Sequence, residues 1–131
     1  MILRGFSYLL GDDVNTDLII SGRYKFAISD MKELSKHIFE DIDPGFYARL
    51  KQGESFLVGG KNFGMGSSRE QAPLVIKEAG IVGVVAKSFA RIFYRNAINI
   101  GLPLIEADTS KIKEQDELNI DLEKGKLRNA T

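Results

Sequence analysis

One short segment of the sequence carries most of the residue types that could bind a small acid. Gly64 and Gly66 are followed by Ser67, Ser68 and Arg69. Glycine lets the backbone approach a ligand closely, the serines supply hydroxyl groups, and the guanidinium of arginine pairs with a carboxylate through two hydrogen bonds. The segment joins an apolar run to an expected helix, whose first N–H groups attract anions. We therefore predict a carboxylate-binding loop.

The same loop also has a purely structural interpretation. Ser67 and Glu70 have the Ser-x-x-Glu spacing of a capping box, in which two side chains satisfy the N–H groups at a helix start. Spacing alone slightly favours this cap over the ligand site, and one loop can fill both roles. Pro73 removes a backbone donor, so the regular helix can instead begin later and leave the serines on an exposed turn.

Few residues of this chain suit other catalytic mechanisms. It contains no cysteine, which excludes a thiolate nucleophile and a metal cluster held by cysteines of this chain. The single histidine, His37, lies in a charged helical segment, so we expect it on the surface and not in a Ser-His-Asp triad. Asp12, Asp13 and Asp17 are expected to form an acidic turn, because the glycine and final glutamate of a calcium loop are missing.

The composition is typical of a soluble globular domain. The chain has 131 residues, of which 44% are hydrophobic and 27% charged, and its 18 basic and 18 acidic side chains give a net charge of zero. A neutral chain has no electrostatic footprint for nucleic acid, and no apolar run is long enough to span a membrane. We expect one domain over residues 1–131 and, from the absence of cysteine, a cytoplasmic location.

Apolar runs alternate with helical patterns along the chain. Strands are expected over residues 2–10, 55–59, 81–86 and 102–105. Helices are expected over residues 30–39, with Ser29 or Asp30 as N-cap, and over 46–51 and 68–79. A hairpin is expected over residues 116–127, and residues 88–99 are polar and aromatic. Strand–helix–strand units of this kind favour a parallel sheet covered by helices.

Four ordered motifs together resemble one enzyme family. They are residues 11–17 (Gly-Asp-Asp-Val-Asn-Thr-Asp), 64–70 (Gly-Met-Gly-Ser-Ser-Arg-Glu), 86–92 (Ala-Lys-Ser-Phe-Ala-Arg-Ile) and 95–102 (Arg-Asn-Ala-Ile-Asn-Ile-Gly-Leu). The chain up to about Ile105 is similar to the small subunits of 3-isopropylmalate dehydratases, in the aconitase superfamily. This resemblance implies an α/β fold, the swivelling β/β/α domain of the aconitase type, with a largely parallel sheet flanked by helices. The family usually continues further, so either the natural chain is short or this is a truncated form.

The resemblance also implies a reaction and a division of labour between two chains. Enzymes of this family isomerise 2-isopropylmalate and 3-isopropylmalate, small dicarboxylates of leucine biosynthesis, by dehydration and rehydration. A [4Fe-4S] cluster on a separate large subunit acts as the Lewis acid, and the active site forms where the subunits of the hetero-oligomer meet. This chain would then hold no metal or cofactor and would be inactive alone.

Site residues follow from the matched motifs. Ser67 matches the catalytic base of the family, and a serine alkoxide requires a dry site with nearby positive charge. Gly66, Ser68 and Arg69 are expected to bind the substrate, while Asp17 matches an aspartate that supports the site by orienting its neighbours.

Substrate choice in this family is attributed to a loop that here contains Tyr24, Lys25 and Phe26. Phe26 aligns with an arginine of homoaconitase-type chains, so its apolar side chain favours a substrate with an alkyl group. A shift of one or two residues would present Arg23 or Lys25 instead. The alternatives are therefore the small subunit of a homoaconitase or dimethylmalate dehydratase, or a non-catalytic carboxylate-binding module of the same fold.

Overall fold

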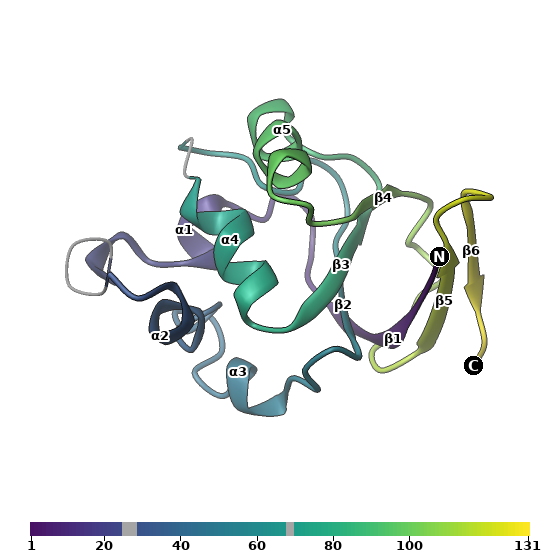
Figure 1. Ribbon diagram of the computed structural model, residues 1–131, viewed down its shortest axis with the longest axis horizontal. Helices are drawn as coiled ribbons and strands as arrows, with labels where there is room; N and C mark the ends of the chain where they lie inside the picture. The colour runs from purple at the N-terminus through teal and green to yellow at the C-terminus, as the bar shows by residue number, and fades with distance from the viewer. Residues whose placement is uncertain (25–28, 68–69) are drawn as a thin grey trace.

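A six-stranded sheet forms the frame of the molecule in the computed structural model, which describes residues 1–24, 29–67 and 70–131 (Figure 1). The strands are β1 (Ile2–Leu9), β2 (Ser55–Val58), β3 (Ile81–Ala86), β4 (Leu104–Glu106), β5 (Glu117–Asp121) and β6 (Lys126–Asn129). Their order across the sheet is β4-β3-β2-β1-β5-β6. Strands β1 to β4 pair in parallel, and the antiparallel β5–β6 hairpin adds to β1. The expected α/β fold with a largely parallel sheet is confirmed.

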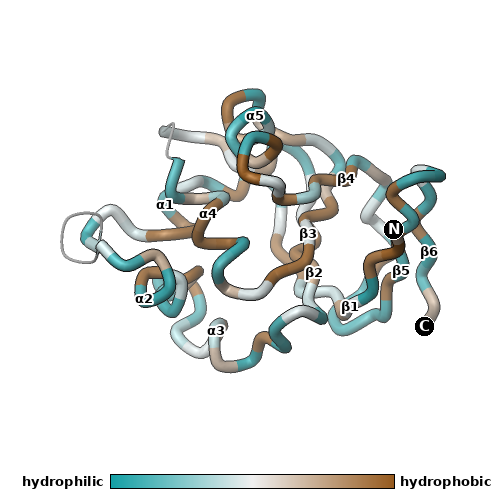
Figure 2. Tube along the Cα trace, in the orientation of Figure 1, coloured by the Kyte–Doolittle hydropathy of each residue, from teal (hydrophilic) through white to brown (hydrophobic). Residues whose placement is uncertain are grey.

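Strands β2 and β3 are buried on both faces and separate two cores. All four residues of β2 and five of the six residues of β3 are buried, as expected for parallel strands covered on both sides. Because side chains alternate along a strand, Leu57 and Val84 enter the core beneath the helices. Phe56 and Val85 instead enter a smaller core with residues of the hairpin. In Figure 2 the apolar colour is correspondingly concentrated in β2, β3 and α4.

The helices lie together beside the parallel strands in Figure 1. They are α1 (Thr16–Ile19), the 3₁₀ turn η1 (Gly22–Tyr24), α2 (Met31–Ser35), α3 (Phe46–Arg49), α4 (Gln71–Glu78) and α5 (Arg91–Asn99). Helix α4 lies centrally and contacts α1, α2, α5 and β3. Within the described ranges, no helix has the length and hydrophobicity needed to cross a membrane.

Helix α2 is shorter than its sequence pattern predicts. It begins at the expected cap, where the Asp30 carboxylate accepts a hydrogen bond from the Lys32 N–H at 2.9 Å. It ends at Ser35, however, although the apolar spacing continues to residue 39. Phe39 has a left-handed backbone (φ 54°), and its N–H donates to the Ile19 carbonyl at 2.9 Å. This long-range bond, which no local pattern reveals, replaces the helical one.

Helix α5 lies within residues 88–99, the polar and aromatic segment for which the sequence pattern predicts no regular element. Two of its nine residues, Phe93 and Ala97, are buried. Their spacing of four places both on the inner side of the helix. The outer side combines arginines with apolar residues, so the apolar residues of the segment do not all lie on one face.

Candidate active site

Three loops meet at the carboxyl ends of β1, β2 and β3. The loop after β2 is central, because Gly60 donates its N–H to the Gly11 carbonyl at 3.1 Å and accepts from the Lys87 N–H at 3.0 Å. Further along, the Gly64 N–H donates to the Val14 carbonyl at 2.7 Å. In open α/β sheets, ligands bind at this edge of the strands. The fold therefore brings three of the sequence motifs together where a site is expected.

The central loop needs glycine at two positions. Gly64 and Gly66 have φ values of +86° and +97°, which side chains rarely tolerate. A Cβ at Gly64 would lie 2.2 Å from the ring of Phe93, and one at Gly66 would lie 2.7 Å from the amide oxygen of Asn15. Both backbone shape and available space thus exclude larger residues.

Ser67 is exposed at the end of this loop and is held there through its backbone. The Thr16 hydroxyl donates a hydrogen bond to the Ser67 carbonyl at 2.8 Å. Thr16 is 3% exposed, and its own N–H donates to the Met65 carbonyl at 2.9 Å. Helix α1 therefore fixes the position of the serine and leaves it on an exposed bend.

The capping-box interpretation of this loop is wrong. Helix α4 begins at Gln71, and its N-cap is Glu70, which makes no capping hydrogen bond through its side chain. Ser67 is therefore too far from the helix to be its N-cap. Pro73 falls in the first turn, where its missing N–H has no helical partner to lose. The alternative prediction, a serine on an exposed turn before a later helix start, is confirmed for Ser67.

A pocket of about 200 Å³ lies beside Ser67. Its described lining consists of Thr16, Gly64, Gly66, Ser67, residues 90–93 and Asn96. The wall formed by α5 adds two polar side chains, those of Arg91 and Asn96, to which sequence reasoning gave no role although both lie in the quoted motifs. A larger hollow of about 570 Å³ lies at the amino ends of the strands. We assign the site to the smaller pocket because it contains the motif residues.

Residues 14–109, which include most of these loops and the pocket, match the Aconitase C-terminal domain family. The chain belongs to this family. The resemblance inferred from four motifs is thereby confirmed, and the pocket beside Ser67 is a feature of an aconitase-type domain.

Similar proteins share nearly the whole of this aconitase-type domain. Over its full length, the chain is 56% identical to 3-isopropylmalate dehydratase small subunit 2 of Archaeoglobus fulgidus, and the match covers 79% of that protein. Over 99% of its length, the chain is also 51% identical to the methanogen homoaconitase small subunit of Methanothermobacter thermautotrophicus, and this match covers 75% of that protein. A crystal structure of 3-isopropylmalate dehydratase from Methanocaldococcus jannaschii superimposes on this chain with a TM-score of 0.92 and 51% sequence identity. The match covers 97% of this chain and 75% of the chain in that structure.

The predicted site residues of the aconitase-type domain fall into three groups. Gly66 and Ser67 line the pocket. Asp17 lies on α1 next to Thr16, with its N–H bonded to the Asn15 side chain at 2.8 Å. Outside the described residues lie Lys25, Phe26, Ser68 and Arg69. In the described ranges no group of three or more acidic or histidine side chains is placed to hold a metal ion.

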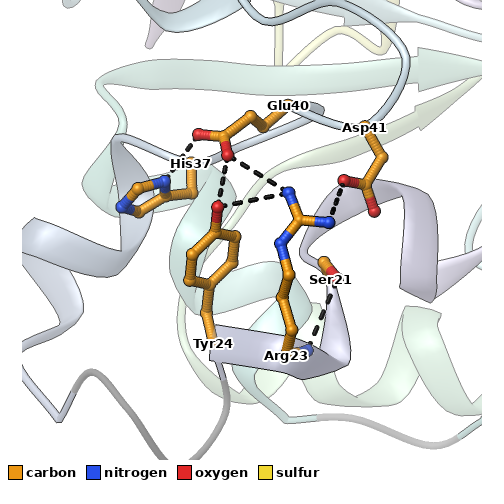
Figure 3. Close-up of polar contacts among 6 residues, drawn as sticks. All are labelled: Ser21, Arg23, Tyr24, His37, Glu40 and Asp41. Atoms are coloured by element: carbon orange, nitrogen blue, oxygen red, sulfur yellow. Dashed lines mark hydrogen bonds and ion pairs between the residues drawn. The ribbon is translucent and has the colours of Figure 1, made fainter.

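Tyr24 belongs to a separate polar cluster (Figure 3). Its hydroxyl donates to the Glu40 carboxylate, and its ring stacks on His37 with 4.1 Å between centroids. Arg23 lies 3.3 Å from Glu40 and 2.8 Å from Asp41. This double pairing favours a structural role for Arg23 over the substrate-facing role that a shifted alignment would give it. His37, expected on the surface, is partly buried here, with 30% of its side chain exposed.

Glu40 accepts most of the hydrogen bonds of this cluster. Hydrogen bonds from the Tyr24 hydroxyl, and then from His37 at 2.6 Å, lower the pKa of Glu40 below its ordinary value. A carboxyl group whose pKa is lowered by folding stabilises the fold while it is ionised. This stabilisation is present above about pH 4.5, the ordinary value for the group, and is lost as the pH falls through the lower pKa of the folded state.

We therefore predict that Glu40→Gln lowers the free energy of unfolding at pH 7 by about 1 kcal/mol, a value discounted for solvent screening. The difference from the unsubstituted chain should be smaller at pH 3, below the ordinary pKa of 4.5, because the carboxyl group becomes protonated as the pH falls. Urea unfolding at both pH values measures it. Glu33→Gln, at a glutamate with 58% of its side chain exposed, serves as control and should change stability by less than about 0.5 kcal/mol. An effect of Glu40→Gln that is equal at both pH values would contradict the prediction.

Proposed function

We propose that this chain is the small subunit of a 3-isopropylmalate dehydratase, a hydro-lyase of leucine biosynthesis. The proposal rests chiefly on one observation: a full-length match at 56% identity to a subunit of that name accompanies a pocket with Ser67 at its edge. The substrate would be 2-isopropylmalate or 3-isopropylmalate, which the enzyme interconverts. The reaction removes a hydroxyl group from one carbon and a proton from its neighbour, and returns them in exchanged positions.

Ser67 is the proposed base in this scheme. Its Oγ, as an alkoxide, would take the proton from the carbon next to a substrate carboxylate and return it to the neighbouring carbon during rehydration. Such an alkoxide needs positive charge nearby. Arg91 lines the same pocket, and Arg69 follows two residues later in the sequence. We assign Arg69, Ser68 and the backbone at Gly66 to the substrate carboxylates, because a guanidinium and N–H groups suit planar anions.

Departure of the hydroxyl group requires a Lewis acid, which a [4Fe-4S] cluster supplies when it is bound. This chain lacks the cysteine thiolates that hold such a cluster. We therefore assign the cluster to a large subunit that joins this chain in a hetero-oligomer. The cytoplasmic location expected from the absence of cysteine stays a prediction.

A homoaconitase small subunit is the second candidate, because one relative at 51% identity carries that name. The two enzymes differ in whether the substrate carries an alkyl group or a further carboxylate. Burying that carboxylate without a cation is unfavourable. The apolar Phe26, in the segment that also contains Tyr24 and Lys25, favours the alkyl group. Asp17, beside Thr16 on α1, is proposed to orient neighbouring groups of the site.

Reconstitution tests the proposed function directly. We predict no dehydratase activity for this chain alone, and activity after anaerobic assembly with the cluster-bearing large subunit of the same organism. Assays with isopropylmalate, dimethylmalate, citrate and homocitrate should give the highest kcat/KM with isopropylmalate. Faster turnover of homocitrate would identify a homoaconitase. An assembled complex that converts none of these acids would identify a non-catalytic binding module.

The role of Ser67 gives the second prediction for the assembled enzyme. Ser67→Ala should lower kcat by about 10²–10⁴-fold or more, because general-base catalysis typically contributes that much. Subunit assembly and thermal stability should change little, since Ser67 is exposed and caps no helix. Ser110→Ala, at an exposed serine outside the pocket lining, is the control. Near-normal turnover of Ser67→Ala would refute this role.

The position of Ser67 gives a further prediction. Thr16→Val removes the hydroxyl group that holds the Ser67 carbonyl, and should lower kcat roughly ten- to a hundredfold because small displacements of a reacting group slow catalysis strongly. Thr109→Val is a close control, since Thr109 is also buried and its hydroxyl donates to the Gly59 carbonyl at 2.8 Å. Each variant should lose about 1 kcal/mol of stability. An equal loss of kcat in both would show a general effect of destabilisation.

A further inference from the structure

The outward side of α5 exposes an unusual amount of apolar surface for so short a helix. Ile92, Tyr94 and Ile98 are 52%, 41% and 55% exposed, whereas Phe93 and Ala97 supply its buried side. These three are among the eight large apolar side chains exposed in the described part of the chain. Tyr94 and Ile98 are neighbours on the helix surface because they are four residues apart. Ile92, two residues from Tyr94, lies toward the other edge of the exposed side, across Arg91 and Arg95. Scattered exposed apolar residues are ordinary, whereas apolar residues gathered on one side of a helix are typical of an interaction surface.

This surface continues directly into the proposed active site. Ile92 is half exposed and also lines the pocket of Ser67, together with Arg91 and Asn96 of the same helix. In Figure 1 no other element lies above α5. A chain that brings a metal cluster to Ser67 must cover the mouth of this pocket, and its surface must then reach α5.

The charge of the helix also suits a particular partner. Residues 91–99 contain Arg91 and Arg95 but no acidic residue, in a chain whose net charge is zero. Neither arginine is ion-paired with a carboxylate in the described part of the chain. Tyrosine and arginine are among the residue types that most often dominate the binding energy of interfaces. A complementary surface would combine apolar side chains with carboxylates.

Aromatic packing holds this surface in place before a partner binds. The Tyr94 ring lies 6.1 Å from that of Phe89, centroid to centroid, and Phe89 stacks on Phe93 at 6.4 Å. Phe93 in turn contacts Phe63 of the active-site loop edge-on at 5.5 Å. A surface that is already ordered loses little conformational entropy on binding.

We propose that Arg91, Ile92, Tyr94, Arg95 and Ile98, the α5 face, form the docking surface for the large subunit that carries the cluster. The inference rests on the proposed function, because that function requires a second chain at the pocket. The partner is identified by its chemistry: a metal-cluster protein whose docking surface is apolar and acidic and whose cluster lies near its edge.

Ile98→Ser and Ile42→Ser form a matched pair for the test. Both isoleucines are about half exposed, at 55% and 53%, but Ile42 lies outside α5 and the pocket lining. The dissociation constant for the large subunit, purified anaerobically with its cluster, is measured by calorimetry without substrate. We expect Ile98→Ser to raise the Kd at least tenfold and Ile42→Ser to leave it within twofold. At saturating small subunit, kcat should match the unsubstituted enzyme for both.

Arg95→Ala provides a second variant that leaves the apolar packing intact. It should weaken assembly severalfold and reduce the dependence of the Kd on salt, because screened charge pairs would be lost. Circular dichroism and melting temperature verify that each variant is folded. If Ile98→Ser and Arg95→Ala both assemble as tightly as Ile42→Ser, the α5 face is not the docking surface.

The two proposals fail in distinguishable ways. If the unsubstituted chain binds the large subunit but converts none of the acids, the proposed function is wrong, while the difference between Ile98→Ser and Ile42→Ser still tests the docking surface. If the complex is active and its assembly is insensitive to Ile98→Ser and Arg95→Ala, the function stands and the docking surface is refuted. Absence of any binding by the unsubstituted chain overturns both.

Discussion

Parallel pairing of β1, β2 and β3 is the constraint on which the site depends. It places the carboxyl ends of three strands at one edge of the sheet, so the loops that follow them must share a small space. The hydrogen bonds of Gly60 to both neighbouring loops, and that of Gly64 to Val14, are possible only in this arrangement. The crowding explains why glycine occupies the positions facing Phe93 and Asn15.

Features with a local cause could be predicted from the sequence. Strands β2 and β3 are recognisable as apolar runs, and the hairpin is recognisable as an alternation of apolar and polar residues. The cap at Asp30 is recognisable as a polar residue before a helical pattern. The exposed turn at Ser67 could be predicted because Pro73 lacks a backbone donor, which favours a later helix start. Two of the predicted site residues, Gly66 and Ser67, line the pocket, and their chemical roles stay predictions.

Features with a distant cause could not be predicted. Helix α2 ends early because Phe39 bonds to Ile19, twenty residues before it. The pairing of Arg23 with Glu40 depends on a turn that brings η1 against the segment after α2. The Ser-x-x-Glu pattern suggested a cap because spacing alone does not reveal where a helix starts. The sequence pattern does not predict helix α5, whose exposed side carries apolar residues such as Ile92 and Ile98 among its arginines.

Helix α5 separates two requirements that enzymes assembled from two chains must reconcile. Its inner residues, such as Phe93 and Ala97, support the pocket, whereas Tyr94 and Ile98 take little part in the core. Tyr94 and Ile98 can therefore be substituted without disturbing the pocket, unlike Arg91 and Ile92, which line it. The outer surface of one short helix is in this way free to vary while the shape of the pocket stays constant.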